Sequence, residues 1–484
     1  MIKELNRVSL GIGVLFGALF VSATVIQVFQ VDNLRVDPRN VRTVYDSYAT
    51  ERGSILVGST LIAESVPADD VFRYQRIYHG GGLYAPITGY YTINQGISGL
   101  EFAMNDKLSG QSNSQFFDQV MALVSGTDPR GASVKLTVNA AVQQAARDAL
   151  GELTGAAIAI EPSTGRILAL VSTPSFDPND LASHDNELVL SKYTSLVNSG
   201  SQPLINRAIT GDLYHPGSVF KLVVAAAALD SGIMSEQSTV PNPAKLKLPL
   251  SGSSIRNWSG NSCGPEESVT IATALRLSCN IPFAEIGALV GESRIHDYAE
   301  AFGFGATVEI PMVVTPSTFP SGMDEAQLML SAFGQFDVRV TPLQIAMVSS
   351  AIANGGVLMS PTIVDSVLAR DLSPLAPFTP VEYSTPISPE TANVLRDMMV
   401  AGVSNGVASG ARIRGVSVAG KTGTAENGEG QPYTLWFTGF APAENPRVAV
   451  VVVVENGGGA GQSASGNSLV APIARKIMEA VLAQ

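Results

Sequence analysis

The stretch YHPGSVFKLVVAAAAL, residues 214–229, decides how this chain is interpreted. Pro216 and Gly217 interrupt the chain just before an apolar, alanine-rich run, which predicts a buried helix. Ser218 stands at the start of that helix, and Lys221 follows three residues later on the same helix face. A lysine whose pKa is lowered can take the proton of a serine hydroxyl and make the serine a nucleophile. Composition alone produces about one Ser-x-x-Lys motif in such a chain, so a serine that only caps a core helix is the alternative.

A second motif, Ser278-Cys279-Asn280, lies between two apolar runs that predict helices. The same Ser-x-Asn spacing also occurs in Gly/Ser-rich loops of this chain, where polar residues are usually only solvated. A serine held between two helices could relay a proton between Lys221 and a leaving group, and the Asn280 amide could hold a substrate carbonyl. The position of this motif therefore makes Ser278 and Asn280 candidate site residues.

A third motif, Lys421-Thr422-Gly423, continues with Thr424 and stands between a short apolar run and a Gly-rich turn, which predicts a strand. A lysine beside hydroxyl groups suits a carboxylate, because it offers one point charge and two hydrogen-bond donors. Gly423 would let a backbone or a ligand approach closely. An exposed strand lysine is the alternative for this triplet.

Together the three motifs, in this order, resemble the signature of the penicillin-binding protein and serine β-lactamase superfamily. The chain is most similar to class B penicillin-binding proteins, which are monofunctional peptidoglycan D,D-transpeptidases, and among these to the actinobacterial penicillin-binding protein A group. The resemblance covers nearly the whole chain. It rests on YxPGSxFK (214–221), KTGTAE (421–426), WFTGFAP (436–442) and, in the first third of the chain, GxxGLE (96–101).

The resemblance implies a role for each candidate residue. Ser218 attacks the carbonyl between the two D-alanines of a stem peptide, Lys221 is the general base, and Ser278 passes the proton to the departing D-alanine. Asn280 orients the substrate amide, and the backbone N–H groups of Ser218 and Thr424 form the oxyanion hole. The terminal carboxylate of the peptide, or that of a β-lactam, is bound by residues of the third motif (Lys421, Thr422, Gly423, Thr424). No metal ion or organic cofactor is required.

The run VAVVVVV (448–454) is too short for a membrane span and predicts a buried strand. Strands near both ends of residues 151–484 predict one α+β domain whose ends meet in a single antiparallel sheet. The segments expected to form helices between them are 219–230, 270–277, 282–291, 342–354 and 389–402. The resemblance implies helices on both sides of that sheet and a smaller mixed α/β pedestal before it. We therefore expect a cytoplasmic tail at 1–7, a transmembrane anchor at 8–31, a non-catalytic, dimerisation-like N-terminal domain at 32–150 and a transpeptidase domain at 151–484.

The expected anchor follows from a run without charge between Val8 and Val31. Twenty-four helical residues would be about 36 Å long, enough to cross the hydrocarbon layer of a bilayer with some tilt. Lys3 and Arg7 precede the run, which places the tail in the cytoplasm and the remainder outside the plasma membrane. A cleaved signal peptide is the alternative, but its apolar region should be shorter and end at a small-residue cleavage site.

Composition excludes several classes of function. Forty-two acidic residues against thirty basic ones give a net charge of −12, and no Lys/Arg-rich run is present, which argues against a nucleic-acid partner. Two cysteines and four scattered histidines provide no ligand set for a structural zinc ion or an iron–sulfur cluster. Cys263 and Cys279 fall on the oxidising side of the membrane, so a disulfide between them is expected, with two buried free thiols as the alternative.

Some questions stay open at the level of sequence. The acyl-enzyme could be resolved by an amine, as in a transpeptidase, or by water, as in a D,D-carboxypeptidase. A β-lactam sensor or an inactive scaffold of the division machinery is an alternative from another class. The resemblance also implies a polytopic membrane glycosyltransferase as partner. The sequence does not distinguish a diaminopimelate acceptor from a lysine acceptor, or septation from elongation.

Overall fold

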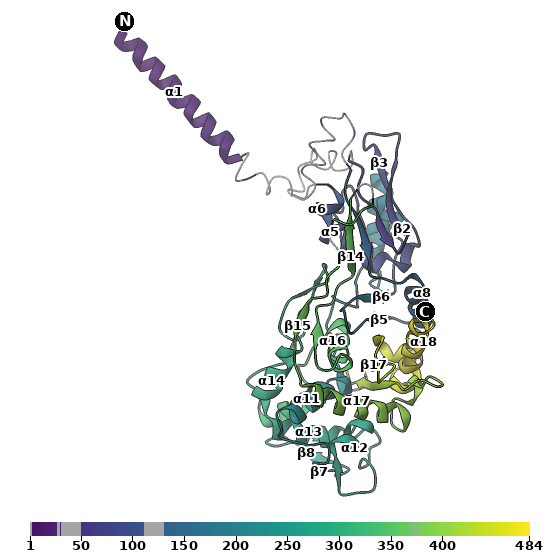
Figure 1. The fold of residues 1–484 in the computed structure, drawn as a ribbon. Coiled ribbons are helices and arrows are strands. Elements are labelled where there is room, and N and C mark those ends of the chain that lie inside the picture. The colour runs from purple at the N-terminus through teal and green to yellow at the C-terminus, as the bar shows by residue number, and fades with distance from the viewer. Residues whose placement is uncertain (1, 27–29, 31–49, 111–129, 370–371, 376–377) are drawn as a thin grey trace.

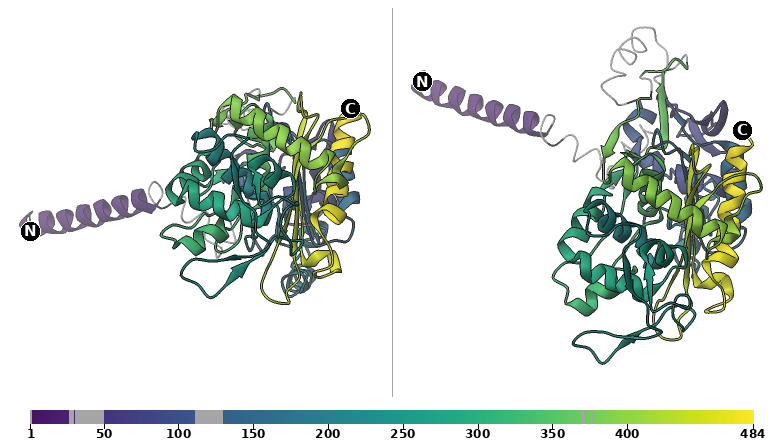
Figure 2. Two further views of the ribbon diagram at one scale, coloured as in Figure 1. Left: turned by 90° about the horizontal axis from the view of Figure 1, so that it is seen from below. Right: turned by 60° about the horizontal axis from the view of Figure 1, so that its bottom comes forward.

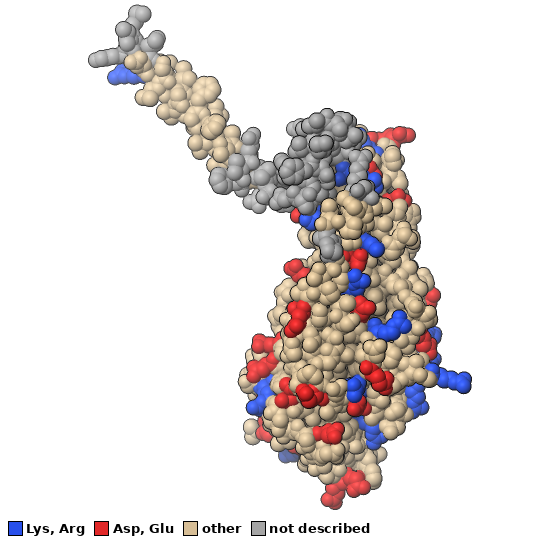
Figure 3. Space-filling model, viewed as in Figure 1, with Lys and Arg blue, Asp and Glu red and all other residues tan. Residues whose placement is uncertain are grey.

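The fold was taken from a computed structural model, which describes residues 2–26, 30, 50–110, 130–369, 372–375 and 378–484. These residues form an N-terminal helix, a smaller domain and a larger domain that carries the three motifs (Figure 1). On the face drawn in Figure 3, acidic and basic side chains are scattered among each other over both domains.

The N-terminal helix α1 (Ile2–Thr24) includes most of the expected tail and ends before the expected end of the anchor. Its segment Asn6–Thr24 has a mean hydropathy of 1.6, none of it is buried, and it is the one helix in the described ranges that is long and apolar enough to cross a membrane. Residues 27–29 and 31 of the expected anchor lie outside the described residues. The chain therefore has one N-terminal apolar helix, consistent with a single-pass anchor or a signal sequence.

The smaller domain is built on a five-stranded sheet in the order β14-β4-β1-β2-β3, in which β1 pairs with β4 in parallel and the other neighbours are antiparallel. Three short helices accompany this sheet. The bounds are β1 (Ile55–Val57), β2 (Thr60–Pro67), β3 (Tyr74–Tyr78), β4 (Ser133–Leu136), β14 (Val364–Leu368), α4 (Ala85–Thr88), α5 (Gly99–Ala103) and α6 (Asn105–Leu108).

A buried ion cluster holds the smaller domain together. Glu101 is fully buried and accepts hydrogen bonds from Arg52 Nε (2.5 Å), Arg76 Nε (2.7 Å) and the Tyr78 hydroxyl (3.2 Å). Burial alone would raise the pKa of Glu101, but Arg76 and Arg52 outweigh it and lower that pKa. The glutamate of the GxxGLE motif is therefore the shared counter-ion of two buried arginines.

Two sets of contacts cross the expected boundary at residues 150 and 151. Helix α8 (Ala140–Leu150) packs against the larger domain, because Val142, Ala146 and Leu150 form one apolar face that is buried on the larger sheet. Strand β14, from the expected transpeptidase domain, pairs with β4 and completes the smaller sheet. Helix α8 therefore packs with the larger domain, and the later part of the chain supplies one strand to the smaller sheet.

The larger domain contains the predicted antiparallel sheet, in the order β16-β17-β18-β5-β6. The first strands and the last strands of the domain meet at its centre, where β18 pairs with β5. The bounds are β5 (Gly155–Ile160), β6 (Ile167–Thr173), β16 (Ala419–Ala425), β17 (Thr434–Ala441) and β18 (Val448–Val454).

Helices cover both faces of this sheet (Figure 2). In β18 every residue is buried: Val451 and Val453 face the core that holds the central helices, while Val450 and Val452 face α8 and the C-terminal helix α18 (Ala471–Leu482). A strand buried on both faces needs no polar alternation, which explains the unbroken valine run.

The helical part lies in the middle of the domain sequence. The predicted helices are present as α11 (Lys221–Asp230), α12 (Ile271–Arg276), α13 (Asn280–Val290), α16 (Pro342–Ala353) and α17 (Pro389–Ser404). Elements that the sequence analysis did not single out are α9 (Asn179–Ala182), α10 (Asn186–Val197), α14 (Glu292–Ala301), α15 (Glu325–Ser331), and short strands β7 (Thr239–Pro241), β8 (Leu246–Lys247), β9 (Ser254–Ile255), β10 (Ser268–Thr270), β11 (Val308–Glu309), β12 (Val313–Val314), β13 (Leu358–Met359) and β15 (Glu382–Ser384). Residues 221–228 of α11 are all buried, as expected of a helix that is apolar on all sides.

Candidate active site

Ser218 lies in a single turn of 3-10 helix, Gly217–Val219, that leads directly into α11. This turn is fixed against the edge of the sheet: Gly217 has φ +54°, its N–H donates to Gly334 O (2.9 Å), and an added Cβ would lie 3.2 Å from Ala425. Ser218 itself is half-buried and faces a cavity. The sequence Pro-Gly before the serine thus makes the turn that presents its hydroxyl.

Lys221 is completely buried at the start of α11. Its Nζ donates to Ser278 O (2.8 Å) and to Asn280 Oδ1 (2.8 Å), so these two hydrogen bonds lead to the second motif and not to Ser218. Burial, and then the nearby Lys421, lower the pKa of Lys221 well below its usual value. A buried lysine whose pKa is lowered gives up its proton more easily than an ordinary lysine and can then act as a base.

Ser278 joins the two lysines. Its carbonyl accepts from Lys221, and its hydroxyl oxygen accepts from Lys421 Nζ (2.6 Å). The residue has φ +59°, in the left-handed region that a serine rarely adopts. Strained backbone of this kind persists where surrounding contacts determine it, and it is found often at functional sites.

Lys421 lies on the edge strand β16 and is 2 % exposed. Besides Ser278, its Nζ donates to Thr422 O (2.8 Å), and burial lowers the pKa of Lys421 to about 7. The lysine is therefore not the exposed strand residue of the alternative interpretation.

A cavity of about 380 Å³ separates this edge of the sheet from the helical part. It brings together side chains from all three motifs with residues of three further segments. The lining residues are Ser218, Trp258, Leu277, Ser278, Asn280, Gly406, Val407, Thr422, Thr424, Ser465, Gly466 and Asn467. Five of the eight predicted site residues are thus in its wall, and both lysines lie directly behind it.

Gly423 allows the close approach of a backbone, which is one of the two uses expected of it. A Cβ at this position would lie 3.0 Å from Pro216 O and 3.0 Å from the Trp436 Cβ. The glycine lets strand β16 approach the turn that carries Ser218, so it permits packing between two motifs.

One site residue was missed by the sequence analysis. Asn257 is 4 % exposed, and its Oδ1 accepts hydrogen bonds from the backbone N–H of Asn280 (2.9 Å) and of Ile281 (3.0 Å). Cys279, at the cap position of α13, makes no side-chain cap bond, so Asn257 caps this helix from another segment. An asparagine in a polar loop gives no such signal in the sequence.

The same loop is tied to the second motif by the two cysteines. Cys263 and Cys279 are joined in a disulfide with their Cα atoms 6.0 Å apart. Asn242 holds Cys263 from the other side, since it accepts from Cys263 N (2.8 Å) and donates to Cys263 O (3.1 Å). The residue between Ser278 and Asn280 is therefore covalently linked to a neighbouring segment.

Comparison with known proteins agrees with this geometry. The family model described as the penicillin binding protein transpeptidase domain matches residues 155–479, and the penicillin binding protein A dimerisation domain matches residues 52–134. The chain belongs to the penicillin-binding protein transpeptidases.

Relatives in this family match the chain from end to end. Peptidoglycan D,D-transpeptidase PbpA of Mycolicibacterium smegmatis is 42 % identical over 100 % of this chain and 99 % of its own length, and PbpA of Mycobacterium tuberculosis is 40 % identical over the same shares. The penicillin G acyl-enzyme complex of penicillin-binding protein A from M. tuberculosis is 39 % identical, with a TM-score of 0.85 over 90 % of this chain and 100 % of that one. The expected family and fold class are thereby confirmed.

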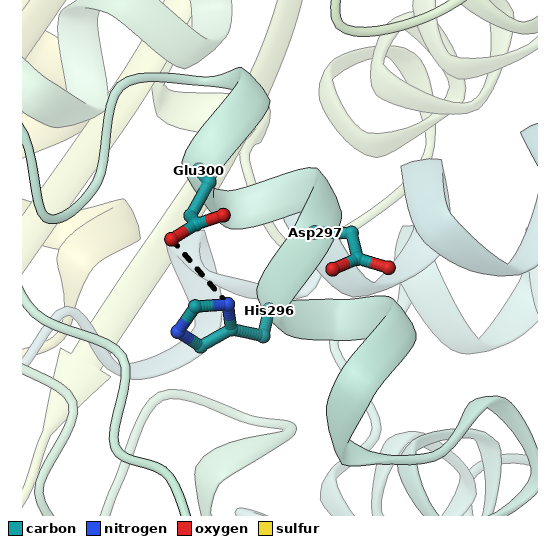
Figure 4. A group of neighbouring side chains, drawn as sticks. All are labelled: His296, Asp297 and Glu300. Atoms are coloured by element: carbon teal, nitrogen blue, oxygen red, sulfur yellow. Dashed lines mark ion pairs between the residues drawn. The ribbon is translucent and has the colours of Figure 1, made fainter.

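A possible metal-binding group lies far from these motifs in the sequence. Among the described ranges, His296, Asp297 and Glu300 of α14 are the three neighbouring side chains of suitable type. His296 and Glu300 form an ion pair one helical turn apart, while Asp297 projects from a different side of the helix (Figure 4). The two acids are exposed, so this group has no buried ligand that would favour a bound ion.

Proposed function

We propose that this chain is a membrane-anchored serine D,D-transpeptidase that cross-links peptidoglycan stem peptides through an acyl-enzyme on Ser218. The observation that supports this best is the contact of two buried lysines with one residue, Ser278, beside the nucleophile. One lysine supplies a base that activates the serine, and the other supplies a cation that binds the terminal carboxylate of the peptide. Acyl transfer from a peptide that ends in a carboxylate requires both.

Binding would begin at the end of β16. The terminal carboxylate of the donor peptide lies against Lys421 and the hydroxyl groups of Thr422 and Thr424, which supply one cation and two donors once the Thr422 hydroxyl turns from Val407 O to the ligand. The carbonyl between the two D-alanines then lies above Ser218, with the backbone N–H groups of Ser218 and Thr424 as its oxyanion hole. The Asn280 amide orients the substrate amide.

In acylation, neutral Lys221 accepts the proton of the Ser218 hydroxyl while the serine Oγ attacks the carbonyl carbon. The tetrahedral intermediate collapses as the C–N bond breaks, and the proton passes from Lys221 through the Ser278 hydroxyl to the departing D-alanine nitrogen. Lys421 contacts the Ser278 hydroxyl, and Lys221 contacts the carbonyl of the same residue, so both lysines lie beside the group that would relay the proton. The amine of a neighbouring stem then attacks the ester and releases Ser218.

Two alternatives differ from this proposal in ways that can be measured. A D,D-carboxypeptidase would use the same acylation but would release the acyl group to water. A sensor or scaffold without activity would have no use for two buried lysines, which each lose favourable hydration. The contacts of the lysines therefore favour an enzyme over a scaffold.

The test is mass spectrometry of the full-length chain in detergent after incubation with penicillin G, beside Ser218→Ala. We expect one covalent adduct on Ser218 and none on the variant, whose fold is checked by its thermal unfolding. A donor pentapeptide with and without an acceptor amine then distinguishes the two enzymes: cross-linked product supports a transpeptidase, and free acid alone supports a carboxypeptidase. Absence of an adduct from folded protein contradicts the proposal.

The location and the partner belong to the same proposal. Helix α1 anchors the chain in the plasma membrane, with its few leading residues in the cytoplasm and the catalytic domain outside. The partner is a polytopic membrane glycosyltransferase that contacts α1 and the smaller domain. Replacing α1 by an unrelated membrane helix should abolish co-purification of that enzyme from membranes, and undiminished recovery would exclude contact through α1.

A further inference from the structure

Trp258 bridges the two halves of the catalytic cavity. It comes from the loop between β9 and β10 in the helical part, it lines the same cavity as Ser218, and yet its side chain is 57 % exposed. Its ring lies 5.4 Å from that of Tyr433, the residue before β17, in an edge-on contact. Because this exposed tryptophan lines the cavity and also contacts a residue next to the sheet, it forms a roof over one end of the cavity.

The position of Trp258 is fixed by its neighbours on both sides. Directly before it, Asn257 caps α13 and Arg256 O accepts from Asn280 Nδ2 (3.2 Å). After it, Asn257 Nδ2 donates to Asn261 O (3.1 Å), and Cys263 is bonded to Cys279. The loop therefore moves together with the Ser-x-Asn motif, and the indole is presented to the cavity by a rigid support.

The direction of strand β16 shows which part of a donor lies under this roof. If the donor carboxylate is bound at Lys421 and Thr422 and the scissile carbonyl at Thr424, the remaining acyl group points along β16 toward Ala425 and the turn before Tyr433. A strand advances about 3.3 Å per residue, so an acyl group reaches this turn within three or four residues' length. Trp258 and Tyr433 thus lie on the acyl side of the reacting bond, and the leaving group lies at the opposite end.

We propose that Trp258 is a specificity-determining residue, which contacts the acyl part of the donor and favours flat apolar groups there. This inference rests on the proposed acylation of Ser218. The indole lines the cavity and contacts Tyr433 on the side of the sheet, so an apolar or aromatic side chain gains a packing surface that a donor without one does not use.

The test compares two β-lactams that differ only on the acyl side. Penicillin G carries a phenylacetyl group, and 6-aminopenicillanic acid has the same ring system with a free amine. Rates of Ser218 acylation are measured by intact mass for the full-length protein and for Trp258→Ala, Trp258→Phe and Leu250→Ala. Leu250 is fully exposed in the same region and serves as the matched control.

We expect Trp258→Ala to slow acylation by penicillin G about 3- to 10-fold, which corresponds to the loss of one aromatic contact. The rate of acylation by 6-aminopenicillanic acid should change less than 2-fold. Trp258→Phe should retain most of the penicillin G rate, and Leu250→Ala all of it. An equal loss with both compounds would show that Trp258 only supports the motif, and an unchanged or faster rate with penicillin G would likewise overturn the proposal. No adduct with either compound on the unaltered chain would instead contradict the proposed function.

Discussion

Substitution of Asn257 by alanine should disturb the site although Asn257 performs no chemistry. The side chain makes three hydrogen bonds while 4 % exposed: two accepted from the first turn of α13 and one donated to Asn261 O. At about 1 kcal/mol for each bond lost, the free energy of unfolding should fall by about 3 kcal/mol. The same change releases the helix end that positions Asn280, so penicillin acylation should slow on the order of 10-fold, since small displacements of a positioned group have large effects on rate.

Urea unfolding followed by tryptophan fluorescence measures the first effect, and intact-mass kinetics with penicillin G measure the second. Asn261→Ala is the matched control, because the side chain of Asn261 is exposed and only its backbone oxygen is used. Both quantities should stay close to those of the unaltered chain in this control. If Asn257→Ala destabilised the protein without slowing acylation, the cap would be structural only and our account of how Asn280 is positioned would be refuted.

Three further predictions concern groups that the structure buries. Burial lowers the pKa of Lys421 to about 7, so the lysine loses its charge above that pH. The non-covalent dissociation constant of penicillin G for Ser218→Ala should therefore rise about 10-fold for each pH unit above 7. A dissociation constant that stays unchanged from pH 6 to 9 would contradict the role of Lys421 as the cation that binds the carboxylate. Glu101→Gln should lower the free energy of unfolding by about 3–5 kcal/mol, because two buried arginines lose their counter-ion. In the unaltered chain the same contribution should be lost in acid, as the pH falls through the lowered pKa of Glu101. Urea titrations at several pH values measure both effects. Joint replacement of Cys263 and Cys279 by serine should lower the free energy of unfolding by about 3 kcal/mol, because the loop between them is no longer closed in the unfolded chain. Two thiols that alkylate without reductant in the unaltered, denatured chain would exclude the disulfide.

Local patterns were sufficient to predict the parts of the fold that depend on neighbours in sequence. The Pro-Gly turn before an apolar run predicted the helix start at Ser218, and the valine run at 448–454 predicted a buried strand. The meeting of the two chain ends in one sheet followed from the order of elements. Each of these features is decided within a few residues or by the simplest connection between strands.

Features that depend on distant contacts could not be predicted from the sequence. Strand β14 pairs with β4 across nearly half of the chain, and nothing in its own residues indicates which sheet receives it. Asn257 is 23 residues from the N–H group that it caps, so its environment is invisible in a list of loop residues. Gly423 was expected to admit a backbone or a ligand, and only the folded chain shows that the backbone of Pro216 approaches it.

The left-handed conformation of Ser278 unites the three motifs. A serine in this conformation costs about 1–2 kcal/mol. Its carbonyl accepts a hydrogen bond from Lys221 and its hydroxyl accepts one from Lys421. The next residue, Cys279, is fixed by the disulfide and by its N–H, which donates to Ala274 O (2.9 Å). The strain directs both polar groups of one residue toward different lysines. Because the charge of Lys421 helps to lower the pKa of Lys221, a donor carboxylate that neutralises Lys421 should raise the proton affinity of Lys221. The general base would then become stronger once a donor is in place to be attacked.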